Sequence, residues 1–100
     1  MNVGEYAKYV VNNMGRATLG NALNIATKFV SEYDFTEFLT SINEYIGVAL
    51  TSNLLPKDKC YNILYLSDKA SKMLKSEFRY NKSFIIDDFI VDMWGVINGD

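Results

Sequence analysis

Hydrophobic residues in the middle of the chain recur with the spacing of an amphipathic helix. Between residues 34 and 50 they step by three and four positions, which places them on one face of a helix for about four turns. They are Phe35, Phe38, Leu39, Ile42, Tyr45, Ile46, Ala49 and Leu50. Asp34 precedes them and Glu37 follows three residues later, a pair typical of a helix N-terminus. Such a helix needs other helices to cover its apolar face, so this segment is the expected centre of the fold.

Two segments before this centre show the same spacing. The Asn2 and Glu5 pair predicts the start of a first helix, which continues to residue 14. We expect that helix to end at Gly15, a residue favoured where the backbone turns left-handed. A second helix is predicted at residues 17–33, with only Asp34 and its neighbours separating it from the central one. So short a link predicts a tight antiparallel corner or a sharp kink.

A fourth helix is predicted at residues 57–78, after a break at residues 51–56. Pro56 suits the first position of that helix. Its apolar residues alternate by three and four, as in a coiled-coil seam. The seam consists of Ile63, Leu66, Ala70 and Met73 and ends at Glu77. A kink at Ser67 and Asp68 is an alternative to one continuous helix.

A fifth helix is predicted at residues 84–98, with Ser83 as its N-cap. Its apolar arc covers about half of the circumference, which predicts contact with more than one neighbouring helix. The residues from Phe84 to Ile86 also have the composition of a strand, but the aspartates that follow fit a helix surface better.

These segments together predict a compact all-α bundle of about five amphipathic helices, forming one domain across residues 1–100. The expected core is the hairpin of the second and central helices, covered by the other three. The residues expected to be nearly fully buried are Leu23, Phe29, Phe38, Leu39, Ile42 and Ile46.

Composition removes most kinds of catalysis. The chain has no histidine, so the usual general base and the commonest ligand of transition metals are missing. Gly15 and Gly20 do not form a phosphate-binding loop, and we expect no cofactor and no enzymatic activity. Cys60 has no second cysteine to pair with, which predicts a buried thiol in a reducing, cytoplasmic setting. The sequence shows no export signal and no apolar run long enough to span a membrane.

Seven of the ten basic residues lie between Lys57 and Lys82. Four of them follow a three-four spacing that predicts a single ridge, with two tyrosines one or two turns earlier. This basic and aromatic strip consists of Tyr61, Tyr65, Lys72, Lys75, Arg79 and Lys82. The formal charge of −2 argues against nucleic acid as a partner. Pairing of the strip with the acidic last helix is the preferred interpretation.

Asp87, Asp88 and Asp92 form an acidic face on the last predicted helix. Asp88 and Asp92 are one turn apart, the spacing of aspartate-rich Mg²⁺ motifs, because hard cations take oxygen ligands. No second acidic cluster accompanies them, so a partner-binding face is preferred over a metal site.

Three functions follow in order of preference. The first is a small acidic module that binds and blocks a larger protein, as toxin-immunity proteins, antitoxins and phage-encoded inhibitors do. Its expected partner is a basic enzyme that acts on nucleic acid, met by the acidic face. The second is a homo-oligomeric structural or regulatory domain, such as a homodimer that associates through apolar residues outside the core faces. Those residues are Ile25, Val48, Tyr61, Tyr65 and Val91. The third is a metal-carboxylate enzyme.

Overall fold

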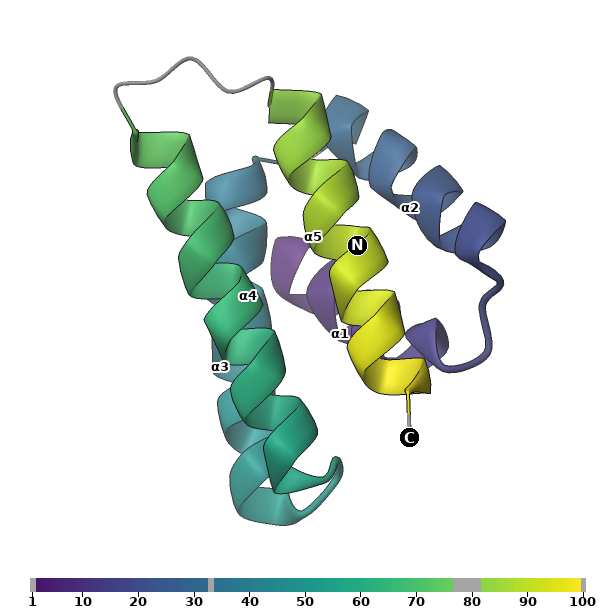
Figure 1. The fold of residues 1–100 in the computed structure, drawn as a ribbon, viewed down its shortest axis with the longest axis vertical. Coiled ribbons are helices and arrows are strands. Elements are labelled where there is room, and N and C mark those ends of the chain that lie inside the picture. Colours follow the sequence, from purple (N-terminus) through teal and green to yellow (C-terminus); the bar gives the residue numbers. More distant parts are fainter. Residues whose placement is uncertain (1, 33, 77–81, 100) are drawn as a thin grey trace.

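The computed structural model describes residues 2–32, 34–76 and 82–99, apart from the side chains of residues 26, 27 and 29–32. The described residues form an all-α fold, as the hydrophobic spacing predicts (Figure 1). Its helices are α1 (Val3–Met14), α2 (Leu19–Glu32), α3 (Phe35–Ser52), α4 (Lys57–Lys75) and α5 (Lys82–Asn98). None of these helices combines the length and the apolar character that crossing a membrane requires.

Both predicted N-terminal caps are formed. The Asn2 side-chain oxygen accepts the backbone N–H of Glu5 at 2.8 Å, and Asp34 Oδ1 accepts that of Glu37 at 3.1 Å. Each bond satisfies a backbone donor that has no partner inside the helix, which fixes where α1 and α3 begin.

Gly15 does not adopt the left-handed backbone that we expected. It keeps right-handed values, with φ −69° and ψ −12°, and the left-handed residue is Asn53 at the end of α3, with φ 58°. At the end of α1 the carbonyl of Met14 accepts the backbone N–H of Ala17 at 3.3 Å and also Asn98 Nδ2 at 3.1 Å. A long-range side chain therefore supplements the local turn that ends the helix.

Several predicted helix ends shift by a few residues. α2 begins after Thr18, whose Oγ1 accepts the N–H of Asn21 at 3.2 Å. Pro56 is the N-cap of α4 and not its first residue, and Ser83 lies inside α5 and not before it. Residues 84–86 are helical, so the strand alternative is wrong, and α4 runs without a break through the residues where a kink was considered. Phe78, the predicted end of α4, lies outside the described residues.

The observed neighbours of each helix differ from those predicted from the sequence. α5 lies between α4 and α2 and also touches α1, while α3 packs against α1 and α4 (Figure 1). Within the described residues the main neighbour of α2 is α5, so the core is not a hairpin of α2 and α3. The broad apolar arc of α5 explains the difference, because one neighbouring helix cannot cover it.

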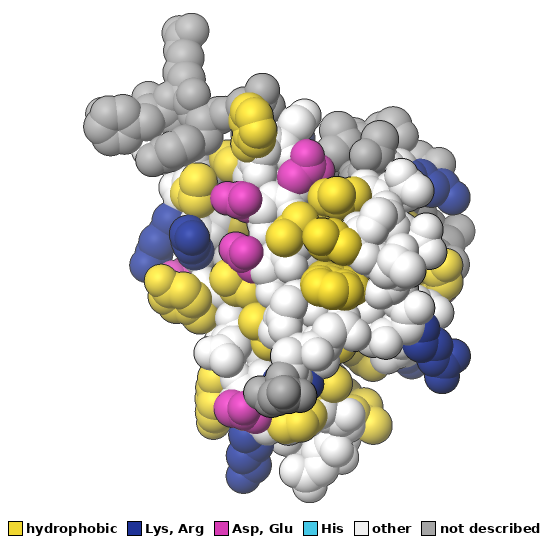
Figure 2. Space-filling model, turned by 45° about the vertical axis from the view of Figure 1, so that its right-hand side comes forward, with side chains coloured by type: hydrophobic (Ala, Val, Ile, Leu, Met, Phe, Trp, Pro, Cys, Tyr) yellow, Lys and Arg dark blue, Asp and Glu magenta, His cyan; other side chains and the backbone are white. Residues whose placement is uncertain are grey.

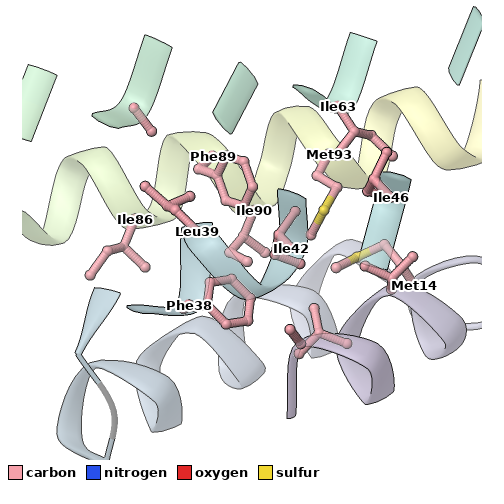
Figure 3. Close-up of a cluster of buried hydrophobic side chains, with 14 of the residues drawn as sticks. Met14, Phe38, Leu39, Ile42, Ile46, Ile63, Ile86, Phe89, Ile90 and Met93 are labelled. Carbon is pink, nitrogen blue, oxygen red and sulfur yellow. The ribbon is translucent and has the colours of Figure 1, made fainter. Parts of the chain in front are cut away.

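The core is built mainly from side chains of α1, α3, α4 and α5 (Figure 3). The predicted burial is confirmed for Phe38, Leu39, Ile42 and Ile46. Leu23 is only half-buried, and Phe29 is among the side chains that the structure does not describe. The Phe38 ring lies 5.9 Å from that of Tyr6 on α1 and 6.4 Å from that of Phe89 on α5, between centroids. These aromatic contacts connect three helices through one side chain.

The last turn of α5 is held by hydrogen bonds to other helices and loops. Trp94 Nε1 donates to the carbonyl of Ala17 at 2.8 Å, beyond the end of α1. Lys59 Nζ on α4 donates to the carbonyls of Ile97 and Gly99 at 2.7 and 3.0 Å. These carbonyls lie where a helix lacks internal donors, so the ammonium group acts as a C-terminal cap.

Ser67 occupies a core position on α4 that the seam pattern assigned to Leu66. It is 1% exposed, whereas Leu66 is half-buried, and the buried line of α4 is Cys60, Ile63, Ser67 and Ala70. Among the described residues, the Ser67 hydroxyl has no hydrogen-bond partner. A buried hydroxyl without a partner carries an uncompensated desolvation cost.

Replacing Ser67 by alanine is therefore expected to raise the free energy of unfolding by about 1–2 kcal/mol. Urea denaturation measures the change. The Ser71→Ala variant, one turn further along α4, controls for the helix propensity of alanine. A destabilised Ser67→Ala protein would contradict the prediction by revealing a partner of the hydroxyl, such as a buried water.

Candidate functional site

The solvent-exposed side of α5 carries an aromatic residue, two acidic residues and a glycine. Phe84, Asp88, Asp92 and Gly95 follow one another at steps of four, four and three, so they share one side of the helix. All four are exposed, and Phe84 is 72% exposed despite being a large aromatic side chain. The same helix contributes Ile86, Ile90 and Met93 to the core from its opposite side.

The acidic face is open to solvent. Asp88 and Asp92 are exposed and Asp87 is half-buried. Carboxylate groups lie next to an area of hydrophobic side chains on the face that Figure 2 shows. No ion pair joins the three aspartates to a basic side chain of the described residues. The acidic face therefore presents carboxylates that form no ion pair with a described side chain, although Lys69 of α4 lines the same cleft as Asp88 and Asp92.

An apolar hollow lies beside this acidic face and crosses α5 at Gly95. It has a volume of about 550 Å³ and is open on its outer side. Its walls come from three helices and consist of Leu19, Leu66, Val91, Asp92, Trp94, Gly95 and Val96. Leu19, in the first turn of α2, is 40% exposed and lines the hollow.

A second cleft lies between α4 and α5, where Lys69 faces Asp88 and Asp92. Its volume is about 10 Å³, enough for one water molecule at most. The cleft is therefore too small for an organic ligand, although it contains charges of both signs.

The carboxylates of α5 do not form a metal centre with other described residues. Three or more His, Cys, Asp or Glu side chains are nowhere grouped to hold a metal ion in the described ranges. Asp88 and Asp92 alone would supply at most four of the six or more oxygen ligands that Ca²⁺ and Mg²⁺ take.

The basic and aromatic strip does not form one ridge. Lys72 and Lys75 end α4, Ser76 is extended with ψ 146°, and Lys82 begins α5, so the helical spacing is interrupted. Arg79 lies outside the described residues. Lys72 Nζ pairs with Asp68 at 2.9 Å within α4, and this hydrogen bond raises the pKa of Lys72. The predicted pairing of the strip with α5 is absent among the described side chains.

Tyr61 and Tyr65 remain exposed on α4, at 59% and 66%. They lie one turn apart on the same helix as the Lys72 and Asp68 pair. These two tyrosines are separate from the hollow on α5, whose α4 wall is Leu66.

Cys60 is fully buried on α4. Burial raises the pKa of its thiol, and the nearby charge of Asp58 raises it further. A buried thiol with a raised pKa is a poor nucleophile, which fits the structural role that the sequence predicts for Cys60.

Comparison with known proteins finds no relative: no family model, no curated protein and no solved structure matches the chain. The interpretation of the site therefore depends on its geometry and chemistry.

Sequence reasoning identified the acidic face but not the hollow next to it. Val91 was recognised as an apolar residue outside the core face. The signal in the sequence was a glycine one turn after this valine, on the helix that carries the aspartates. The contributions of Leu19 and Leu66 depend on the packing of α2 and α4 and carry no such signal.

Proposed function

We propose that this chain is a small, non-enzymatic protein-binding module that binds a larger protein through α5 and blocks it. Immunity proteins, antitoxins and phage-encoded inhibitors act in this way. The observation that carries the proposal is the outer side of α5, where exposed Asp88 and Asp92 lie beside an apolar hollow. Exposed apolar surface rimmed by charge is typical of protein interaction sites.

The charge of this surface defines the partner that suits it. Enzymes that act on nucleic acid have basic clefts, because they must neutralise phosphate groups. An acidic helix face can occupy such a cleft, and opposite charges accelerate the encounter of the two proteins. The proposal places the pair in the cytoplasm, a reducing compartment that suits the free thiol of Cys60.

Replacing Asp87, Asp88 and Asp92 together by asparagine tests the acidic face. The variant is expected to fold, because the buried side of α5 is unchanged. Affinity capture from the native host, followed by mass spectrometry, provides the partner. Surface plasmon resonance should then show association about tenfold slower than for the wild type, with a flatter dependence on salt, because the steering charges are gone.

The matched control removes three negative charges elsewhere. Glu5, Glu37 and Glu44 are exposed on α1 and α3, and their joint replacement by glutamine makes the same change in net charge. The control should associate at nearly the wild-type rate. An unchanged rate and salt slope in the aspartate variant would remove the acidic face from the interface.

A homo-oligomeric domain is the second candidate function. It is favoured by exposed apolar residues on α3 and α4, where Val48 is 55% exposed and Tyr61 and Tyr65 are more exposed still. Light scattering at micromolar concentration distinguishes the two candidates. A dimer that Tyr61→Ser and Tyr65→Ser together dissociate would support this second function, and a monomer would leave the first.

A further inference from the structure

The apolar hollow on α5 is open because residue 95 is a glycine. A Cβ atom at this position would have no heavy atom within 4 Å, so a side chain there would stand freely in the hollow. Glycine also has a lower helix propensity than alanine, and the local fold does not need it here, since the backbone lies within a regular helix. Packing of the free chain therefore gives no reason for a residue without a side chain at position 95, one turn after Val91.

The walls around Gly95 suit one large apolar side chain. Leu19 from α2 and Leu66 from α4 flank the position, and Val91, Trp94 and Val96 complete an apolar lining. An aliphatic or aromatic side chain inserted there would touch three helices and exclude water from their exposed carbon atoms.

The acidic residues next to the hollow restrict what can carry that side chain. Asp92 is itself part of the wall and Asp88 lies one turn before it. A neutral or acidic surface covering them would bury carboxylates without partners, which is strongly unfavourable. A second copy of the chain in a two-fold contact would also bring Asp92 close to its own symmetry mate. A basic partner would supply cationic side chains that pair with the carboxylates of Asp88 and Asp92.

We propose that the hollow over Gly95 is the anchor pocket for a single large apolar side chain of a basic partner segment, whose Arg or Lys residues pair with Asp88 and Asp92. This inference extends the proposed function by specifying the recognised element. Asp88 and Gly95 are about 10 Å apart along the helix axis, which matches two turns of a partner helix. The expected segment is therefore an amphipathic helix with basic residues one and two turns from its apolar anchor.

A random-peptide phage library provides the probe. Peptides selected on the wild-type protein are expected to combine a large apolar residue with two or more basic residues. Their affinities are then measured by fluorescence anisotropy against two leucine variants. Gly95→Leu fills the hollow and should weaken binding at least tenfold, roughly the effect of losing one anchor. Gly47→Leu is the matched control, because a Cβ at Gly47 on α3 also meets nothing within 4 Å.

The outcomes separate this inference from the proposed function. Equal binding to Gly95→Leu and wild type would overturn the anchor pocket, and so would a selection that yields acidic peptides or none. If the captured partner still depends on Asp87, Asp88 and Asp92, the proposed function survives that failure. If neither Gly95→Leu nor the aspartate variant changes binding of the captured partner, both the anchor pocket and the proposed function are contradicted. Circular dichroism and thermal melting confirm that each variant is folded.

Discussion

The Ile42→Ala variant is expected to lose about 2–5 kcal/mol of unfolding free energy. Ile42 is fully buried in α3 and its side chain lies among those of Phe38, Ile90 and Met93 (Figure 3). Removal of its outer carbons leaves a cavity that these neighbours cannot fill completely, so both the transfer free energy and packing contacts are lost. Urea denaturation followed by circular dichroism measures the loss as a lower midpoint.

The Val48→Ala variant on the same helix is the control for this prediction. Val48 is 55% exposed, so its shortening should change stability by no more than about 0.5 kcal/mol. Similar midpoints for the two variants would show that α3 does not present Ile42 to the core.

The Lys59→Met variant is expected to be destabilised by about 1–2 kcal/mol. Methionine keeps most of the side-chain length but cannot donate to the carbonyls of Ile97 and Gly99, which the ammonium group now bonds. Hydrogen exchange should become faster in the last turn of α5, before any change in α3, because the lost bonds are local to that end.

Lys57 provides the comparison for Lys59. It is exposed in the first turn of α4, two residues earlier, and Lys57→Met removes the same charge without affecting a cap. Equal exchange rates at the end of α5 in the two variants would show that the loss of charge, and not of the hydrogen bonds, determines the effect.

The sequence alone was sufficient to predict those helix ends that depend on hydrogen bonds between residues close together in the chain. The caps at Asn2 and Asp34 join residues three positions apart, so their pattern is visible without a structure. The end of α1 at Met14 was also predicted correctly, but the bond from Asn98 to the carbonyl of Met14 was not predictable, because Asn98 lies far along the chain. The same limit explains why α2 was predicted to pack against α3, since the choice of neighbour depends on how α1, α2 and α4 share the apolar arc of α5.

The candidate site divides in the same way. The exposure of Asp88 and Asp92 was predictable, because carboxylates one turn apart on an amphipathic helix favour the solvent side. The hollow at Gly95 was not, because Leu19 and Leu66 approach it from helices that precede α5 by many residues. Ser67 was also not predicted, because the apolar seam pattern placed Leu66 on the core face of α4, whereas the structure buries the polar residue next to it.

The central position of α5 affects the order in which the protein can become active during its synthesis. α5 leaves the ribosome after the other four helices, yet α2, α4 and α1 all pack against it. A nascent chain that ends before α5 has neither the closed core nor the surface that we propose for the partner. Core closure and binding competence should therefore appear together, and a partner would meet only chains whose folding is complete.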